Sequence, residues 1–271
     1  MISGITFTPS GGSPVTLHAL TGKRVVVRAE GLQGATPVRE VKTLKGQQSG
    51  AYIRSKYFDA RTVTIEGEII GTSIEDSFDE FDTVAKALMA SVSTPGTLKW
   101  TRDSAGQALQ LDCQLASLSP LVLTDGANLV SYQVSLVAGD PRVYDQSETT
   151  GTGDVVTDPG AGNTVAFNNI GSIKTPPKIR VYGGITAPVV RLATGAGFTF
   201  SGVISGGGDY WEIDVQNRTV RLNGATSVLA NLTAATTDWF ELPTGSGNVT
   251  LTGSAISGSP RVDLIYRSAW A

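Results

Sequence analysis

Residues 74–92 read IEDSFDEFDTVAKALMASV, and this is the stretch of the sequence with a sustained helical pattern. Ser73 precedes it as an N-cap with Asp76 three residues on, and a Pro-Gly pair at 95–96 ends the run. Its apolar residues recur at steps of three and four, which places them along one helix face: Phe78, Phe81, Val84, Ala85, Leu88, Met89 and Val92. The sequence therefore predicts one long helix at about 74–93.

The rest of the first half reads as β-strands. Apolar and polar residues alternate at 62–69, 109–115 and 130–136, and further strands are expected at 23–29 and 52–58. Alternating strands bury one face and expose the other, which is typical of antiparallel sheets in sandwiches. The predicted fold class is mainly β, with a first sandwich flanked by a single α-helix.

Residues 31–50 interrupt these strands with a polar stretch that is punctuated by glycine and proline. A segment of this length and polarity between two strands predicts a projecting loop or hairpin rather than core. Projecting arms commonly touch a neighbouring molecule, so this segment is a candidate for such a contact.

A change in composition predicts a domain boundary. Residues 146–163 are dominated by Ser, Thr, Gly and Asp, as expected for a linker or surface loop. The first domain is then 1–145 and the second 164–271. Alternating short strands resume in the second domain, which predicts another sandwich with no helix of its own.

The charge balance argues against nucleic-acid recognition. The chain holds 21 Lys and Arg against 24 Asp and Glu, a net charge of −3, with no basic stripe. The nearest approach to a basic cluster is spread over turns and alternating strands, which predicts a solvated or interfacial face. Its members are Lys42, Lys45, Arg54, Lys56 and Arg61.

The residues that usually carry chemistry are sparse. Cys113 is the single cysteine, and its place on an alternating strand predicts inert packing. His18 is the single histidine, which excludes a multi-histidine metal site. Residues 195–197 (GAG) lack the third glycine of a dinucleotide loop, so no cofactor is expected. A secretory signal and a membrane-spanning apolar run of about 20 residues are not expected either.

Two carboxylate pairs are the remaining catalytic alternative. Glu66 with Glu68, and Glu212 with Asp214, have the residue type that hydrolyses glycosides. Their spacing of two on alternating strands more simply predicts that both members of each pair face solvent. The chain is therefore expected not to be an enzyme.

Aromatic residues of the second half leave a binding role open. Tyr210 and Trp239 are candidates for stacking on the rings of a glycan, whereas Trp211, in phase with Ile213 and Val215, is expected in the core. A carbohydrate-binding adhesin module that recognises host cell-wall glycans is thus the alternative function.

Several strings, taken in order, suggest a family. DYWEID at 209–214, NRTVRLNG at 217–224, WFELP at 239–243 and YRSAW at 266–270 resemble the C-terminal domain of distal tail proteins of long-tailed bacteriophages. YFDARTVTIEG at 57–67, the helix, LKW at 98–100 and DPRVY at 140–144 are similar to the N-terminal domain of the same family. The chain departs from that family at 243–248, PTGSGN, where a tighter Pro-Gly-x-Asn turn is usual.

This resemblance implies a structural virion protein at the tail tip, made in the cytoplasm of the host bacterium. The N-terminal domain would be a tail-tube-like sandwich that closes into a homohexameric ring, and the C-terminal domain a galectin-like sandwich. The ring would join the tail tube protein to the tail-tip hub and continue the channel for tape measure protein and DNA in transit. Receptor-binding or fibre proteins are further expected partners.

The resemblance also suggests where neighbours touch. Residues 31–50 and their flanking strands are the candidates for the ring contact, because a projecting hairpin lends edge strands to a neighbour. The acidic outer face of the helix is a second candidate, for packing against another tail component.

Overall fold

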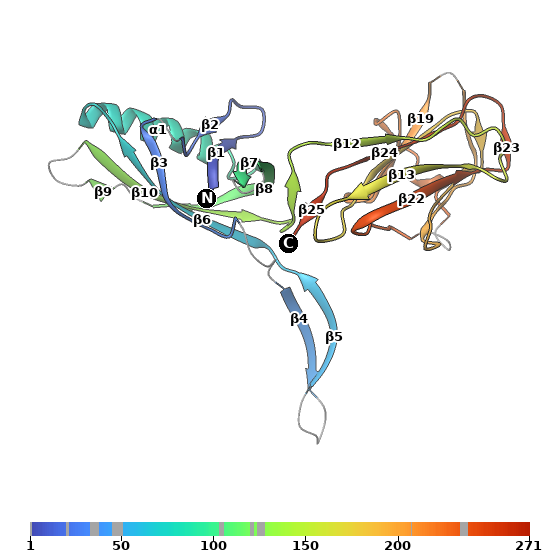
Figure 1. Ribbon diagram of the computed structural model, residues 1–271, viewed down its shortest axis with the longest axis horizontal. Helices are drawn as coiled ribbons and strands as arrows, with labels where there is room; N and C mark the ends of the chain where they lie inside the picture. The colour runs from blue at the N-terminus through green and yellow to red at the C-terminus, as the bar shows by residue number, and fades with distance from the viewer. Residues whose placement is uncertain are drawn as a thin grey trace. The chain divides into compact units, whose positions relative to one another are not determined.

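The computed structural model describes residues 2–19, 22–32, 38–44, 51–102, 106–119, 122–123, 128–206, 208–233 and 238–271. The chain forms two compact units, Met1–Gln146 together with Ala271, and Ser147–Trp270 (Figure 1). The mainly β class with a flanking helix, predicted from the alternation, is confirmed: the described residues contain one α-helix and otherwise mostly antiparallel strands.

The first unit is one continuous antiparallel sheet that is closed by the helix α1. Its strands follow the order β2-β1-β7-β8-β10-β6-β3, with β9 beside β10 and β11 beside β8. The elements are β1 (Ile2–Thr8), β2 (Val15–Thr16), β3 (Arg24–Glu30), β6 (Arg61–Ile70), α1 (Ile74–Met89), β7 (Gly96–Arg102), β8 (Gln107–Leu118), β9 (Val122–Leu123), β10 (Leu129–Ala138) and β11 (Val143–Asp145).

Alternation along β6 and β10 determines which side of the sheet becomes core. The two strands pair from Arg61↔Ala138 to Ile70↔Leu129 without a break. Every second β6 side chain, such as Ile65, is therefore buried, and its neighbours point outward. Trp100 of β7 is fully buried in the same core.

The segment after β2 closes one edge of this sheet. The backbone N–H groups of Leu17 and His18 donate to the Ile5 carbonyl of β1, at 2.8 and 3.1 Å. On its other side, Nδ1 of His18 accepts from the Val26 N–H of β3, at 3.1 Å. His18 thus links β1 to β3, the last strand of the sheet order, through its backbone N–H and its side chain, which protects a stretch of edge strand.

Helix α1 begins as predicted and ends earlier. Oγ of Ser73 accepts from the Asp76 N–H at 3.2 Å, which confirms the cap. The helix ends at Met89, and beyond it the Ser91 N–H bonds only three residues back, to the Leu88 carbonyl, which also accepts a hydrogen bond from Oγ of Ser91.

The buried face of α1 is rotated from the predicted one. Its buried residues are Ser77, Val84, Ala87 and Leu88. α1 packs against β6 and β10. Part of the apolar stripe, notably Phe78 and Met89, is consequently left exposed.

The predicted arm contains a strand. β4 (Val38–Leu44) pairs antiparallel with β5 (Ala51–Phe58), and together they form a two-stranded ribbon that pairs with no other described strand. Figure 1 draws this ribbon leading into β6. The rest of the predicted arm, residues 33–37 and 45–50, lies outside the described residues.

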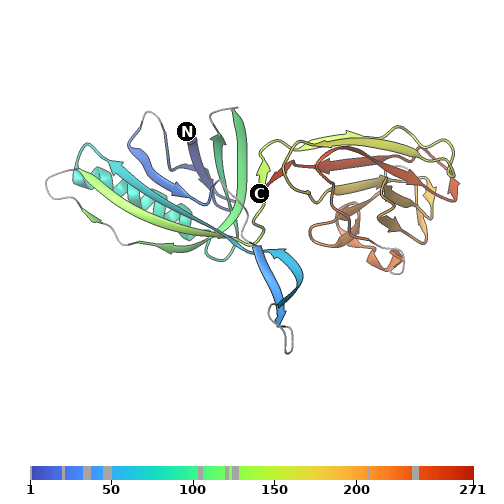
Figure 2. The same cartoon turned by 60° about the horizontal axis from the view of Figure 1, so that its bottom comes forward.

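The second unit is a β-sandwich, in which the two larger sheets enclose the core (Figure 2). One sheet has the order β12-β24-β14-β19-β20-β21, the other β13-β22-β16-β17, and a small third sheet is β18-β15-β23. The strands are β12 (Thr149–Thr152), β13 (Asn163–Asn169), β14 (Lys178–Tyr182), β15 (Ile185–Thr186), β16 (Val189–Leu192), β17 (Gly197–Thr199), β18 (Val203–Ile204), β19 (Tyr210–Asp214), β20 (Thr219–Leu222), β21 (Thr226–Ser227), β22 (Gly245–Thr252), β23 (Ala255–Ile256), β24 (Val262–Tyr266) and β25 (Ala269–Trp270), with one 3-10 turn, η1 (Leu229–Asn231).

The core of this unit is aromatic at one end. The Phe200 and Trp211 rings lie 5.3 Å apart, centroid to centroid, in an edge-on arrangement, and both are buried. The prediction that Trp211 is a core residue is confirmed.

The stretch expected to be a linker contributes to the sandwich. Within 146–163, β12 pairs with β24 from Thr149↔Tyr266 to Thr152↔Asp263, and the side chain of Val156 is buried in the core. β12 is an edge strand with mostly exposed side chains, so its sequence lacks the apolar alternation that would have indicated a strand.

Candidate functional surfaces

Cys113 and His18, the residues suited to nucleophilic or metal chemistry, contribute to packing and hydrogen bonding within the fold. Cys113 is buried on β8, and burial raises the pKa of its thiol to about 12, so it is unreactive packing as expected. His18 uses Nδ1 for the hydrogen bond to β3. Among the described residues, no cluster of His, Cys, Asp and Glu has the arrangement of a metal site. None of the described helices is long and apolar enough to cross a membrane.

The second carboxylate pair is tied into the sheet. Glu212 accepts from Nε of Arg180 at 2.8 Å, across β14 and β19. Asp214, expected to face solvent, is only 8% exposed, because the turn that follows β19 folds back and Asn217 donates to it through both its backbone N–H and its side-chain amide. The prediction of a solvent-facing Asp214 is wrong for that reason.

The first carboxylate pair borders an open groove. Glu66 and Glu68 are half-buried on the outer face of β6, beside a groove of about 330 Å³ that Val27, Ser131 and Gln133 also line. Nε2 of Gln133 donates to Glu66 at 3.0 Å. The groove offers hydrogen-bonding groups and one exposed apolar side chain, Val27.

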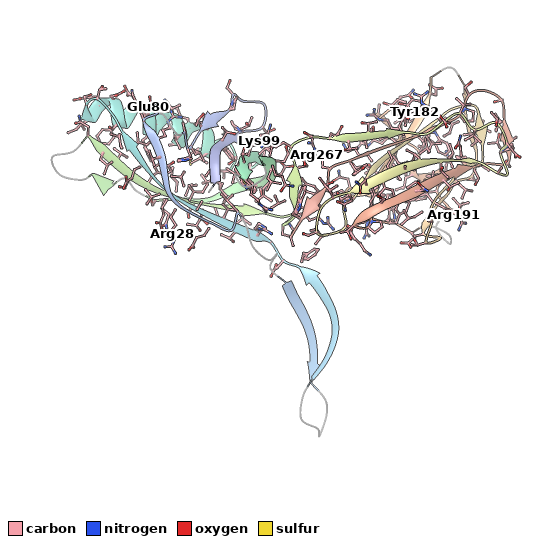
Figure 3. All side chains as sticks on the ribbon, viewed as in Figure 1. Arg28, Glu80, Lys99, Tyr182, Arg191 and Arg267 are labelled. Carbon is pink, nitrogen blue, oxygen red and sulfur yellow. The ribbon has the colours of Figure 1, made fainter. Side chains whose placement is uncertain are left out.

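The N-terminus of α1 is clamped to β3 by ion pairs. Nζ of Lys23 lies 2.5 Å from Asp76, and a guanidinium nitrogen of Arg24 lies 2.5 Å from Glu80, which Figure 3 labels on the helix. The hydrogen bond from Lys23, together with those from the Thr72 N–H and hydroxyl, lowers the pKa of Asp76 to about 2. The same contact raises the pKa of Lys23.

The outward side of α1 combines apolar and acidic residues. Ile74, Phe78 and Met89 are 47%, 37% and 57% exposed, and Val92 just beyond the helix is 53% exposed. Large apolar side chains grouped on an exposed helix face are typical of an interaction surface.

An aromatic and guanidinium cluster lies on the second unit. The rings of Tyr182 and Tyr210 are 5.4 Å apart, from neighbouring strands β14 and β19. The guanidinium of Arg261 lies 4.0 Å from the Tyr182 centroid, and that of Arg180 lies 5.3 Å from the Tyr210 centroid. Figure 3 labels Tyr182 among these side chains. The hydrogen bond to Glu212 raises the pKa of Arg180.

Sequence reasoning singled out Tyr210 in this cluster and missed its neighbours. Arg180 and Tyr182 follow the alternation of β14, which was visible, but their contact with Tyr210 depends on the register of β14 with β19. That register pairs residues about thirty positions apart, and the local sequence carries no direct signal for it.

The two predicted glycan-stacking residues are not brought together. Tyr210 belongs to the sheet of β14 and β19, whereas Trp239 lies beside β17 of the other sheet, next to a backbone hydrogen bond from Asp238 to Gly197. The Trp239 ring is half-buried and meets Phe198 edge-on at 5.2 Å. Each residue therefore belongs to a separate candidate surface.

A further groove, which the sequence does not predict, lies along β13 and β22. It measures about 540 Å³ and is bordered by uncharged amides and hydroxyls above buried aromatic rings. Its lining residues are Ala166, Phe167, Asn168, Ser246, Gly247, Asn248 and Tyr266. The departure of PTGSGN at 243–248 from the resembled family coincides with one wall of this groove.

Comparisons with known proteins agree with these two units. Residues 170–270 match the family model of the siphovirus-type tail component, C-terminal domain. No curated protein sequence matches the chain. Among solved structures, the chain is similar to the Dit protein (gp 19.1) of phage SPP1, described as a paradigm of the hub adsorption apparatus in phages that infect Gram-positive hosts.

The similarity to SPP1 Dit extends over both units. It covers 98% of this chain and 99% of that protein, with a TM-score of 0.71 and 15% sequence identity. The baseplate of phage P2 in its activated conformation gives TM-scores of 0.55 with calcium and 0.53 with strontium, at 8% and 10% identity and 98% coverage of both chains. The resemblance seen in the sequence is thereby confirmed: residues 170–270 match the C-terminal domain of siphovirus-type tail components, and the chain has the fold of SPP1 Dit.

Proposed function

We propose that this chain is a structural, non-enzymatic component of a siphovirus-like phage tail, and that six copies form a ring at its distal end. The observation that carries the proposal is the similarity in fold to SPP1 Dit over both units, at 98% coverage of this chain. A likeness confined to one sandwich would support only a shared domain, because sandwiches serve many functions.

In the proposed role, the ring joins the tail tube to the tail-tip hub and continues the channel for tape measure protein and DNA. Its partners are a second copy of the chain, the tail tube protein and the hub protein, with receptor-binding or fibre proteins as further neighbours. A net charge of −3 suits a conduit, since DNA slides past surfaces that lack rings of phosphate-binding Lys or Arg.

Such a function requires surfaces rather than reactive groups. A cyclic hexamer repeats one contact between two different patches until it closes, and a stable contact buries upward of about 1,000 Å². The β4–β5 ribbon and the exposed side of α1 supply two different patches on the first unit, which we assign to the ring.

Light scattering coupled to size exclusion tests the ring. The purified chain is expected to have a mass six times the 28.2 kDa of one copy. A strictly monomeric protein at micromolar concentration in tail-free solution would contradict ring formation.

Glycan recognition by the second unit is the second candidate function. The half-buried Tyr182–Tyr210 pair, with guanidinium groups against both rings, is the observation that favours it. Saturable binding on an array of cell-wall glycans, lost in Tyr210→Ala and kept in Val203→Ala, is the expected result, and Trp239→Ala tests the separate surface beside β17. Val203 is an exposed apolar residue of the same unit and serves as the control. Equal binding by all variants would exclude these rings as the site.

A further inference from the structure

We propose that the β4–β5 ribbon of one copy docks on the exposed side of α1 in the next copy. This inference rests on the proposed ring and names the two patches that form its repeated contact. The occupant of the helix face is thus a second copy of this chain.

The helix face presents an apolar stripe with an acidic border. Ile74, Phe78 and Met89 recur at steps of four and eleven, so they lie on one side of α1, and 37% or more of each is exposed. Glu75, Asp79 and Asp82 lie next to this stripe around the helix and are exposed as well. The surface therefore suits a partner that is both apolar and basic.

The acidic border is unpaired within the described part of the chain. α1 carries five acidic residues and one basic residue, Lys86. Asp76 and Glu80 are held by Lys23 and Arg24 of the same chain. Glu75, Asp79 and Asp82 have no cation within salt-bridge distance among the described residues.

The ribbon has the complementary composition. Its two strands carry four basic residues, Arg39, Lys42, Arg54 and Lys56, against the single acidic Glu40. They also contain Val, Leu, Ile and aromatic residues, and Phe58 at the end of β5 is 45% exposed. Opposite charges at the border of an apolar contact steer association and fix the register.

Topology makes a neighbouring copy the fitting occupant. The ribbon leads into the first residue of β6, Arg61, whereas α1 follows its last residue, Ile70. A strand of ten residues spans roughly 33 Å, so the root of the ribbon and the start of the helix are separated by that strand. A contact between two different patches of identical copies is heterologous, and it generates a ring when the rotation closes.

A charge swap on the full chain tests the docking. Asp79→Lys with Asp82→Lys reverses the helix border, and Arg54→Glu with Lys56→Glu reverses one strand of the ribbon. Each pair of substitutions is expected to convert the ring to monomers in mass photometry at nanomolar to micromolar concentration. The chain with all four substitutions is expected to regain the ring, because opposite charges again face each other.

Matched controls separate this contact from a general effect of charge. Asp154→Lys with Asp238→Lys makes the same change in net charge as the helix pair, but on exposed positions of the second unit, and it is expected to keep the ring. Met89→Asp places a charge in the apolar stripe and should dissociate the ring, whereas Ile170→Asp, at a 64% exposed position of the second unit, should not. Far-ultraviolet circular dichroism identical to the wild type confirms that each variant is folded.

The outcomes distinguish the docking from the proposed function. A wild-type ring that persists in both the helix and the ribbon variants overturns the docking and leaves the ring intact as a proposal. Failure of the four-substitution chain to regain the ring overturns the pairing of these two patches. A monomeric wild type overturns the proposed ring and, with it, this contact.

Discussion

Gly31 lies where three segments of the first unit meet at the root of the ribbon. Its φ is +80°, and a Cβ added there would lie 2.1 Å from the Thr62 carbonyl oxygen. The buried Arg61 donates from Nη1 to the Gly31 carbonyl at 2.9 Å and from Nε to the Pro141 carbonyl at 2.7 Å. Burial of this guanidinium lowers its pKa. The conformation and the close backbone contact at Gly31 can therefore be adopted only by glycine.

Gly31→Ala is expected to destabilise the protein by more than about 1 to 2 kcal/mol, which is the cost of a left-handed φ before any clash. The measurement is the midpoint of chemical unfolding. Gly139→Ala is the control, because Gly139 has open space around its Cα, and it should change stability by less than about 0.5 kcal/mol. Equal midpoints for the two variants would refute the role assigned to Gly31.

The ionised carboxylate of Asp76 is expected to stabilise the folded protein, and this stabilisation is expected to be lost in acid. Its pKa in the folded protein is lowered to about 2, below the usual value of 3.8, mainly by the hydrogen bond from Lys23. A lowered carboxyl pKa stabilises the folded state above pH 4, and this stabilisation is lost as the pH falls from about 4 to about 2. The melting temperature of Asp76→Asn is therefore expected to fall less steeply than that of the wild type across this range.

Asp154→Asn is the control for that pH dependence. Asp154 is an exposed carboxylate of the second unit with no side-chain partner among the described residues, so the variant should keep the wild-type slope. A wild-type slope in Asp76→Asn as well would show that the Lys23 contact does not stabilise the fold.

Single residues were predictable from sequence where the cause is local. Ser73 was recognised as a cap from its position before the helix, and Cys113 as packing from the phase of its strand. Asp214 was misjudged because a turn three residues later covers it. Tyr182 and Arg261 were missed because their contact joins residues far apart in the chain.

At the scale of elements, the N-cap of α1 makes a measurable contribution to the stability of the protein. Ser73→Ala removes the acceptor for the Asp76 N–H and is expected to destabilise the protein by about 1 kcal/mol in thermal or chemical unfolding. Thr83→Ala removes only a hydroxyl that bonds back to the Asp79 carbonyl within the helix, so its effect should be smaller than about 0.5 kcal/mol. A neutral Ser73→Ala would contradict the importance of this cap.

A strand is predictable from the sequence when one of its faces is buried in a core and the other is exposed. The alternations at 62–69, 109–115 and 130–136 fall inside β6, β8 and β10. The Thr-rich β12 has no such alternation, because this edge strand buries few of its side chains. The exposed side of α1 was likewise hidden, since a helical pattern shows which residues are apolar but not which of them the sheet covers.

At the scale of the whole molecule, the two units divide the proposed work. Both patches assigned to the ring contact belong to Met1–Gln146. A chain of residues 1–145 is therefore expected to retain the ring in size exclusion with light scattering. Loss of the oligomer on removal of the second unit, with the remaining unit still folded by circular dichroism, would refute this division.

The number of subunits in the proposed ring does not follow from the sequence or fold of one chain. A single chain contains no periodicity that counts its copies, and the symmetry of a ring follows from the angle between neighbours. The hexamer is carried over from the resemblance to distal tail proteins, whereas the two sandwiches and the helix follow from the alternation and spacing of this sequence.

Electron microscopy of the purified full-length protein tests the central claim most directly. Class averages viewed along the ring axis are expected to show closed rings with six-fold symmetry and an open central channel. Uniform single particles of one 28.2 kDa chain, or rings with a different symmetry, would contradict the proposed hexamer.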